Sequence, residues 1–239
     1  MINKLSPQSS RTAAAGASRL LAATALVAVT LAPAAQAASV IAYSFSGPKA
    51  GNQDYTQAMG SDFTVNTPII VNSLLAFDHN ADGFTAGTSI TVGIFTQTGV
   101  QVGASQVFTG SAGVIKGGSF RSLPVSIYLP AGNYSIVGQG FNSNDQNYNI
   151  FANITDLPIL DTGAGQLTFG TFRWEQTFAG FGFPTSVGPN DTADTSIKRF
   201  GVASFEFAAA PEPAGVGTLL VGLGMFGFAS RRRRTHLSA

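Results

Sequence analysis

Apolar and polar side chains alternate along much of the chain between residues 38 and 210. Ile90, Val92 and Ile94 fall on one face of an extended segment, and residues 125 to 129 repeat the pattern. A period of two residues predicts β-strands with one buried face. The strands predicted in this way are Val40–Phe45, Ile69–Phe77, Ser89–Thr96, Val100–Phe108, Val125–Leu129, Tyr134–Gly140, Tyr148–Ile154, Gln166–Arg173 and Phe200–Phe207.

Turn residues separate these predicted strands. Thr98-Gly99 lies between two of them and Pro130–Asn133 lies between two others, and both connections are typical of antiparallel hairpins. Many short strands with close turns, and no helical periodicity outside the two ends of the chain, favour a mainly β domain over a parallel α/β fold. We expect residues 38–210 to form an antiparallel two-sheet sandwich, jelly-roll-like in its connections.

The N-terminal segment, residues 1–37, has the parts of a secretory signal peptide in their usual order. Lys4, Arg11 and Arg19 supply positive charge, and the apolar run Leu20–Leu31 follows them. This run is too short for a stable membrane span but fits the apolar helix of a signal peptide. The alternative interpretation is a buried N-terminal helix of the domain itself.

The predicted cleavage site lies just beyond the apolar run. Ala35 and Ala37 place small residues at the positions that precede a signal-peptide cleavage site. Cleavage after Ala37 would make Ala38 the first residue of the exported protein. The secretion machinery is therefore an expected partner.

The C-terminal segment, residues 211–239, also divides into parts. Pro211-Glu212-Pro213 is followed by the uncharged apolar stretch Ala214–Ser230 and then by the consecutive arginines Arg231, Arg232, Arg233 and Arg234. A helix over 214–230 is about 25 Å long, near the lower limit for a transmembrane helix. Arginines resist entry into hydrocarbon and favour the cytoplasmic side, so this topology places the β domain outside the cytoplasm.

This arrangement of Pro-Glu-Pro, an apolar helix and terminal arginines resembles the PEP-CTERM sorting signal. The resemblance covers Pro211 to Ala239. It implies recognition by an exosortase, a membrane-embedded processing enzyme of bacteria that make exopolysaccharide. An ordinary C-terminal membrane anchor is the alternative, and it would share the topology without accounting for Pro-Glu-Pro.

A second resemblance covers the chain from Ser73 to Gly140. It is carried by Phe77–Gly83, Thr91–Phe95, Phe120-Arg121 and Leu129–Tyr134. These segments are similar to an uncharacterised β-sandwich module of secreted bacterial proteins, several of which carry the same type of tail. The resemblance implies a sandwich fold and names no activity.

The charge balance of the β domain differs from that of the whole chain, whose formal net charge is +1. Seven of the 13 basic residues and one of the 12 acidic residues lie in the two terminal segments, so residues 38–210 carry a formal net charge of −5. An acidic domain is not expected to bind nucleic acid, which requires a basic face. The chain has no cysteine, which excludes disulfides, thiolate metal sites and a thiol nucleophile.

Few residues of the β domain are suited to catalysis. His79 is its single histidine and there is no Gly-x-Ser-x-Gly elbow, so a serine-hydrolase triad is not expected. Glu175 and Glu206 are its only glutamates and could form the carboxylate pair of a glycosidase if the fold brought them together. We expect the protein not to be an enzyme.

A cluster of oxygen-bearing side chains fits the opening of a calcium loop. Asp78, Asn80 and Asp82 alternate ahead of Gly83, as the first ligands of such loops do. The twelfth position of an EF-hand would be Ser89, which is not a bidentate glutamate. The alternative is a turn stabilised by Asp and Asn side chains, with Gly83 at positive φ and no ion.

Aromatic residues suggest two further sites. Trp174 could stack on the apolar face of a sugar ring, although a place in the core or at a sheet edge would also suit it. Phe178, Phe181 and Phe183 lie in a glycine-rich segment and would either form an exposed patch or fill the core.

Together these patterns predict an exported structural protein of the cell surface or extracellular matrix of a Gram-negative-type bacterium, associated with exopolysaccharide or biofilm. The alternative is a carbohydrate-binding module that acts on envelope polysaccharide. A glycan-active enzyme is the third hypothesis. No cofactor is expected, apart from the calcium ion considered above.

Overall fold

The computed structural model describes residues 38–150, 157–177, 180–188 and 200–211. The expected signal helix within residues 1–37 and the expected transmembrane helix at 214–230 lie outside these ranges. Within the described ranges, no helix is both long and apolar enough to cross a membrane. The described residues are mainly β, with several antiparallel sheets and one short 3₁₀ turn, η1 (His79–Ala81).

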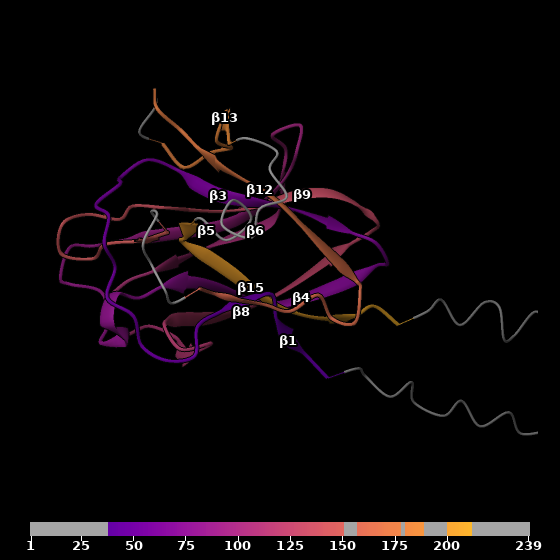
Figure 1. The fold of residues 1–239 in the computed structure, drawn as a ribbon, viewed down its shortest axis with the longest axis horizontal. Coiled ribbons are helices and arrows are strands. Elements are labelled where there is room, and N and C mark those ends of the chain that lie inside the picture. The colour runs from indigo at the N-terminus through magenta and orange to yellow at the C-terminus, as the bar shows by residue number, and fades with distance from the viewer. Residues whose placement is uncertain (1–37, 151–156, 178–179, 189–199, 212–239) are drawn as a thin grey trace, which may run out of the picture. The chain divides into compact units, whose positions relative to one another are not determined.

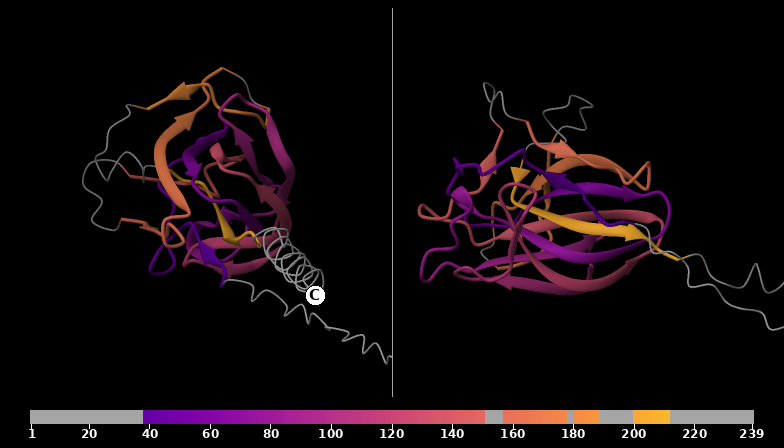
Figure 2. Two further views of the ribbon diagram at one scale, coloured as in Figure 1. Left: turned by 90° about the vertical axis from the view of Figure 1, so that its right-hand side faces the viewer. Right: turned by 90° about the horizontal axis from the view of Figure 1, so that it is seen from below.

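Two main sheets form opposite layers of a sandwich-like β domain (Figure 1). The six-stranded sheet has the order β13 (Ser186–Val187), β12 (Leu167–Trp174), β3 (Met59–Val65), β9 (Gly132–Gln139), β5 (Ile90–Thr96) and β6 (Gln101–Phe108). The five-stranded sheet has the order β1 (Val40–Ile41), β15 (Ala203–Ala209), β4 (Ile69–Phe77), β8 (Phe120–Leu129) and β7 (Val114–Lys116). In Figure 2, the yellow-orange β15 lies among strands from the first half of the chain, as this order requires.

Two short strand pairs lie outside these sheets. The strand β2 (Tyr43–Ser44) pairs with β11 (Ile159–Leu160), and β10 (Tyr148–Asn149) pairs with β14 (Phe200–Gly201). The second pair brings Asn149 and Phe200, which are far apart in sequence, into register.

A core rich in phenylalanine lies between the two main sheets. Phe63 of β3 and Phe205 of β15 join the layers, with ring centroids 4.8 Å apart. Burial of a phenylalanine contributes roughly 1.5–3 kcal/mol, so such a core can stabilise a domain without disulfides. The fully buried phenylalanines are Phe63, Phe77, Phe108, Phe120, Phe141, Phe205 and Phe207.

The six-stranded sheet also has a covered outer face. Phe95 lies on the opposite face of β5 from Ile94, and Phe181 and Phe183 pack against it with ring centroids 5.5 and 6.2 Å away. Phe181 and Phe183 are half-buried on this outer face, so they lie outside the core between the sheets and are only partly exposed. Phe178 lies outside the described residues.

The two sheets approach each other where β6 faces β8. Gln106 of β6 donates a side-chain hydrogen bond to the backbone carbonyl oxygen of Pro124 in β8, at 3.2 Å. Because proline has no N–H, Pro124 cannot continue a regular ladder at this edge.

Several predicted strands match the structure, whereas β3 and the short strands β7, β11 and β13 were not predicted. The prediction of Ile69–Phe77 coincides with β4, whereas Val125–Leu129 is only the second half of β8. The strand β3 was not predicted, because Gly60, Ser61 and Asp62 interrupt its apolar pattern.

Candidate ligand-binding site

One end of the β domain contains a pocket of about 460 Å³. This volume lies within the range of roughly 300–1,000 Å³ that is usual for small-molecule sites. The pocket lies where the C-terminal end of β12 meets the β10–β14 pair. Its lining residues are Gln53, Tyr55, Met59, Asn149, Phe172, Trp174, Gln176 and Phe200.

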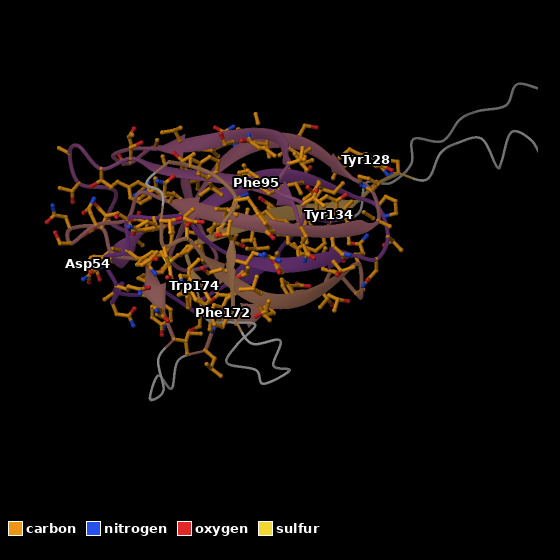
Figure 3. The ribbon with its side chains drawn as sticks, turned by 90° about the horizontal axis from the view of Figure 1, so that it is seen from above. Asp54, Phe95, Tyr128, Tyr134, Phe172 and Trp174 are labelled. Carbon is orange, nitrogen blue, oxygen red and sulfur yellow. The ribbon has the colours of Figure 1, made fainter. Side chains whose placement is uncertain are left out.

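Aromatic rings form one side of the pocket. Phe172 and Trp174 are two residues apart on β12 and therefore project to the same face of the strand. Their rings are stacked, with centroids 5.5 Å apart and an interplanar angle of 24° (Figure 3). Phe200 meets Phe172 edge-on at 5.2 Å. Trp174 is only partly buried, so part of the indole is open to a ligand.

Side-chain amides form another side of the pocket. The Oε1 atom of Gln53 accepts hydrogen bonds from Nδ2 of Asn149 at 2.9 Å and from Nδ2 of Asn147 at 3.1 Å. The side chain of Asn52 makes two hydrogen bonds to the main chain of Asn149. Its Oδ1 atom accepts from the Asn149 N–H, and its Nδ2 atom donates to the Asn149 carbonyl oxygen. The amides are therefore held in place before any ligand binds.

Two buried amide oxygens in this network have no hydrogen-bond partner in the described part of the chain. They are Oδ1 of Asn147 and Oδ1 of Asn149, whose residues are 0% and 1% exposed. Buried polar atoms are almost always hydrogen-bonded, so an unpaired acceptor next to a pocket needs a physical explanation.

Glu175 lies between the lining residues Trp174 and Gln176, and its carboxylate holds the chain that follows them through hydrogen bonds. Its carboxylate accepts five hydrogen bonds, from the N–H of Gln176, from the N–H and hydroxyl of Thr177, and from the N–H and hydroxyl of Thr185. The Tyr55 hydroxyl donates to the Glu175 backbone oxygen. Burial, followed by the charge of Glu175, raises the pKa of Tyr55, which keeps this hydroxyl protonated as a donor.

These hydrogen bonds decide the protonation state of Glu175. The Thr177 hydroxyl and N–H, followed by the donors of Thr185, lower the pKa of Glu175 to about 2, against the opposing effect of burial. A carboxyl with this pKa is ionised at neutral pH and is unsuited to donate a proton as a general acid. Glu175 is therefore well placed to organise the pocket rim.

The two glutamates considered as a glycosidase pair each have partners of their own. Glu175 follows β12 of the six-stranded sheet, whereas Glu206 lies in β15 of the five-stranded sheet. Glu206 forms an ion pair with Lys116, with Oε2 and Nζ 2.5 Å apart.

His79, the single histidine of the β domain, binds the main chain. Its Nδ1 atom accepts a hydrogen bond from the Gly51 N–H at 2.9 Å.

The segment proposed as a calcium loop forms a compact turn. Asp78 is fully buried, and its carboxylate binds Arg121 Nε at 2.6 Å and accepts from the Gly83 N–H. Burial raises the pKa of Asp78, while Gly83 and Arg121 act in the opposite direction. Asn80 and Asp82 are exposed. Among the described residues, no group of three or more His, Cys, Asp or Glu side chains is placed to hold a metal ion.

The backbone of this turn passes through the left-handed region. Gly83 has a φ of 105° and Asn80 a φ of 62°, in the left-handed region that glycine and asparagine tolerate best. Calcium binding by Asp78, Asn80 and Asp82 stays a prediction, in which the ion would compete with Arg121 for Asp78.

The residues assigned to export and sorting lie mostly outside the described ranges. Ala35, Ala37, Glu212, Pro213 and Arg231 to Arg234 belong to this group. Ala38 and Pro211 are described, and both are exposed.

Sequence reasoning found one residue of the pocket, Trp174, and missed the amides. The run Gly51-Asn52-Gln53 and the run Asn147-Tyr148-Asn149 have no spacing that marks a site. They meet because Gln53 and Asn147 form an isolated β-bridge.

No protein-family model matches this chain, and no curated protein matches its sequence. The site is therefore interpreted from its own geometry.

Proposed function

We propose that this chain is an exported, non-enzymatic protein of the bacterial cell surface or extracellular matrix, and that its β domain binds a neutral polysaccharide in the pocket around Trp174. The observation that carries the proposal is the stacked Phe172–Trp174 pair, which shares one pocket with the amides of Gln53 and Asn149. A sugar ring presents an apolar face suited to aromatic rings and a rim of hydroxyls suited to amides.

The contacts of the acidic residues support binding rather than hydrolysis. Both oxygens of Glu175 accept hydrogen bonds from its own loop, and Glu206 is paired with Lys116. Hydrolysis of a glycoside requires two carboxyl groups that flank one bond. In the described part of the chain, no Asp or Glu side chain lines the pocket.

The sequence of the two ends supports delivery to the envelope. The signal peptide ending at Ala37 would direct export, and the PEP-CTERM-like segment from Pro211 to Ala239 would be handled by an exosortase. The resemblance of that tail to a signal used in exopolysaccharide-producing bacteria suggests the polymer that the pocket meets. Our interpretation of the fold is a jelly-roll-like sandwich, and the resemblance of Ser73–Gly140 to a secreted β-sandwich module supports the sandwich.

Binding can be measured through Trp174 itself, because it is the only tryptophan in the chain. We expect neutral oligosaccharides that occupy the pocket to change the intensity or wavelength of its fluorescence in a saturable way. A panel of cellobiose, maltose, lactose and mannobiose, together with a glycan array, would identify the ligand. If the protein binds no glycan on the array and the sugars leave its emission spectrum unchanged, the proposal is contradicted.

A pair of variants tests whether the pocket is responsible. Trp174→Ala should abolish retention on the matching polysaccharide in affinity electrophoresis, and Trp174→Phe should retain part of it because a ring remains. Tyr128→Ala is the matched control, since Tyr128 is an aromatic residue of β8 that is 57% exposed and lies at the opposite end of the domain (Figure 3). Equal retention of Trp174→Ala and Tyr128→Ala would place binding elsewhere.

Export is tested separately from binding. N-terminal sequencing of the exported protein should give Ala38 as the first residue. Replacement of Arg231 to Arg234 by serine should disturb processing and retention in fractionated cells, because each arginine resists membrane insertion by roughly 2.5–3.5 kcal/mol at a helix centre. Unaltered processing of this variant would contradict the sorting role of the tail.

A further inference from the structure

The end of the β domain from which the C-terminal tail leaves is suited to contact with a lipid surface. This tail end is defined by four connections between strands, namely residues 66–68, 97–100, 130–131 and 161–166. Resting on the membrane topology within the proposed function, we infer that the tail end docks on the bilayer surface through Val100 and Tyr128 while residues 214–230 span the membrane. The pocket around Trp174 then faces away from the membrane.

The last strand of the domain leaves the fold at this end. Ala209 of β15 lies opposite Ile69, the first residue of β4. Ala210 then donates its N–H to the carbonyl oxygen of Pro68 at 3.0 Å. The chain is therefore held against residues 66–68 up to the point where the Pro-Glu-Pro segment begins.

Hydrogen bonds join the other connections to this one. The Asn66 N–H donates to the Gln166 carbonyl oxygen at 2.8 Å. The Thr64 hydroxyl donates to Oδ1 of Asn133 at 2.8 Å, and the Asn133 carbonyl oxygen accepts from the Gln97 N–H at 3.3 Å. The four connections therefore lie together at the end where the tail starts.

The tail is too short to carry the domain away from a membrane. Residues 211–213 separate Ala210 from the apolar stretch that begins at Ala214. A fully extended chain advances at most about 3.6 Å per residue, so this segment reaches no further than about 14 Å. The tail end must lie near the bilayer whenever the apolar stretch is inserted. Such a tether raises the effective concentration of the tail end at the lipid surface, so that weak contacts are sufficient for docking.

Two side chains at the tail end are exposed and suited to the lipid interface. Val100 is 62% exposed and immediately precedes β6, and Tyr128 is 57% exposed and precedes the last residue of β8. These ends of β6 and β8 are neighbours, because a Cβ atom at Gly103 would lie 2.8 Å from the Ile127 side chain. Tyrosine is enriched at membrane interfaces, where its ring contacts the lipid and its hydroxyl remains hydrated.

Charged side chains lie mostly away from the tail end. Among the described residues, Asp161 is the only charged side chain within the four connections. The exposed Asp54 lies next to the lining residue Tyr55, at the pocket end (Figure 3). The exposed Asp82 follows β4 at the terminus opposite Ile69. Because charged groups resist approach to hydrocarbon, the tail end is the end that a bilayer disfavours least.

Labels at single cysteines test the contact directly, because the chain contains no cysteine of its own. The full-length chain carrying Val100→Cys or Tyr128→Cys is labelled with an environment-sensitive dye and reconstituted in nanodiscs of phosphatidylethanolamine and phosphatidylglycerol with nitroxide-labelled head groups. We expect the emission at both positions to shift to shorter wavelength and to be strongly quenched. A matched label at Val114→Cys should be neither shifted nor quenched.

Val114 is a suitable control because it differs from Val100 mainly in its place on the domain. It is 66% exposed and pairs with Ser122, which lies about 23 Å along β8 from Leu129 at the tail end. If the labels at Val100 and Tyr128 are quenched no more than the label at Val114, the inference is overturned although the membrane topology stands. If the chain does not stay with the nanodiscs, the topology within the proposed function fails.

A charge placed at the tail end should release the domain from the lipid surface. In the chain labelled at Tyr128→Cys, Val100→Asp should remove most of the quenching, whereas the matched Val114→Asp should leave it unchanged. Both substituted positions are exposed, so circular dichroism should show the same fold for both variants. Equal quenching in the two variants would overturn the role of Val100.

Trp174 reports the orientation of the unaltered protein. It lies at the end of the domain opposite Tyr128 (Figure 3) and is the only tryptophan in the chain. We expect its emission to be unaffected by the head-group nitroxides in the same nanodiscs. Quenching of Trp174 as strong as that of the Tyr128 label would overturn the outward position of the pocket.

Discussion

Arg173 and Asp62 form an ion pair across two neighbouring strands of the six-stranded sheet, with Arg173 Nε 2.6 Å from Asp62 Oδ1. Both side chains are largely buried, and the Ser135 hydroxyl donates to the same oxygen at 2.5 Å. The guanidinium also lies 4.7 Å from the centre of the Phe183 ring. One buried carboxylate thus connects β3, β12 and β9.

We expect Asp62→Ala to destabilise the protein strongly, because it leaves Arg173 buried without its partner. The free energy of unfolding should fall by about 3 kcal/mol, the usual effect of breaking a buried pair from one side. Urea unfolding curves measure this change. The double variant Asp62→Ala/Arg173→Met should recover part of the loss, since it removes both charges, and a double variant less stable than Asp62→Ala would contradict the pairing.

The five hydrogen bonds to Glu175 predict a particular dependence of stability on pH. The pKa of Glu175 is lowered in the folded protein to about 2 from an ordinary value of 4.5, so its contribution is fully present above pH 4.5 and is lost as the pH falls toward 2. Glu175→Gln should therefore be less stable than the unaltered protein at pH 6, by about 2 kcal/mol. The difference should shrink toward pH 2 in thermal melts. A difference that is constant across this range would contradict the assignment.

Gly60 is expected to tolerate no side chain. A Cβ atom at this position would lie 2.2 Å from the backbone oxygen of Ile136, in the neighbouring strand β9. Gly60→Ala should lower the free energy of unfolding by about 3 kcal/mol, because the two strands must separate to admit the methyl group. Gly47→Ala is the control, since a Cβ there meets no atom within 4 Å. Equal melting temperatures of the two variants would contradict the close strand approach.

Calcium provides a test of the turn that contains Asp78. Because Arg121 and the Gly83 N–H already bind the Asp78 carboxylate, we expect excess calcium and a chelator to give the same melting temperature. A calcium-bound native state would instead melt at a higher temperature by mass action. An increase that disappears in Asp82→Asn would establish the calcium site that the sequence pattern suggested.

The sequence pattern was sufficient to predict a strand in which apolar residues follow one another with few interruptions. β4 was predicted at its observed bounds because most of its residues are buried and apolar. β3 was not, because Asp62 looks unfavourable in a buried strand until its partners are known, and Ser135 and Arg173 lie 73 and 111 residues away. Long-range partners of this kind cannot be read from local periodicity.

The same limit applied to the ligand pocket. Trp174 could be singled out because an indole can stack on the apolar face of a sugar ring. Asn149 and Gln53 gave no local signal, since their importance arises from the register of β10 with β14 and from the bridge between Gln53 and Asn147. Glu175 was noticed for its chemical type, whereas its observed contacts indicate a role in holding the rim.

The part of the pocket lining that the structure describes is uncharged, which has a consequence for the salinity at which its contacts can persist. Interactions between exposed charges weaken as dissolved ions accumulate, with a screening length of about 10 Å at 0.1 M and about 3 Å at 1 M. The described pocket residues are aromatic, aliphatic or amide-bearing, so their contacts with a sugar involve no ionic partner. Contacts of these described residues with a sugar would consequently weaken little between fresh water and brine, whereas contacts between exposed charges are strongly screened in brine.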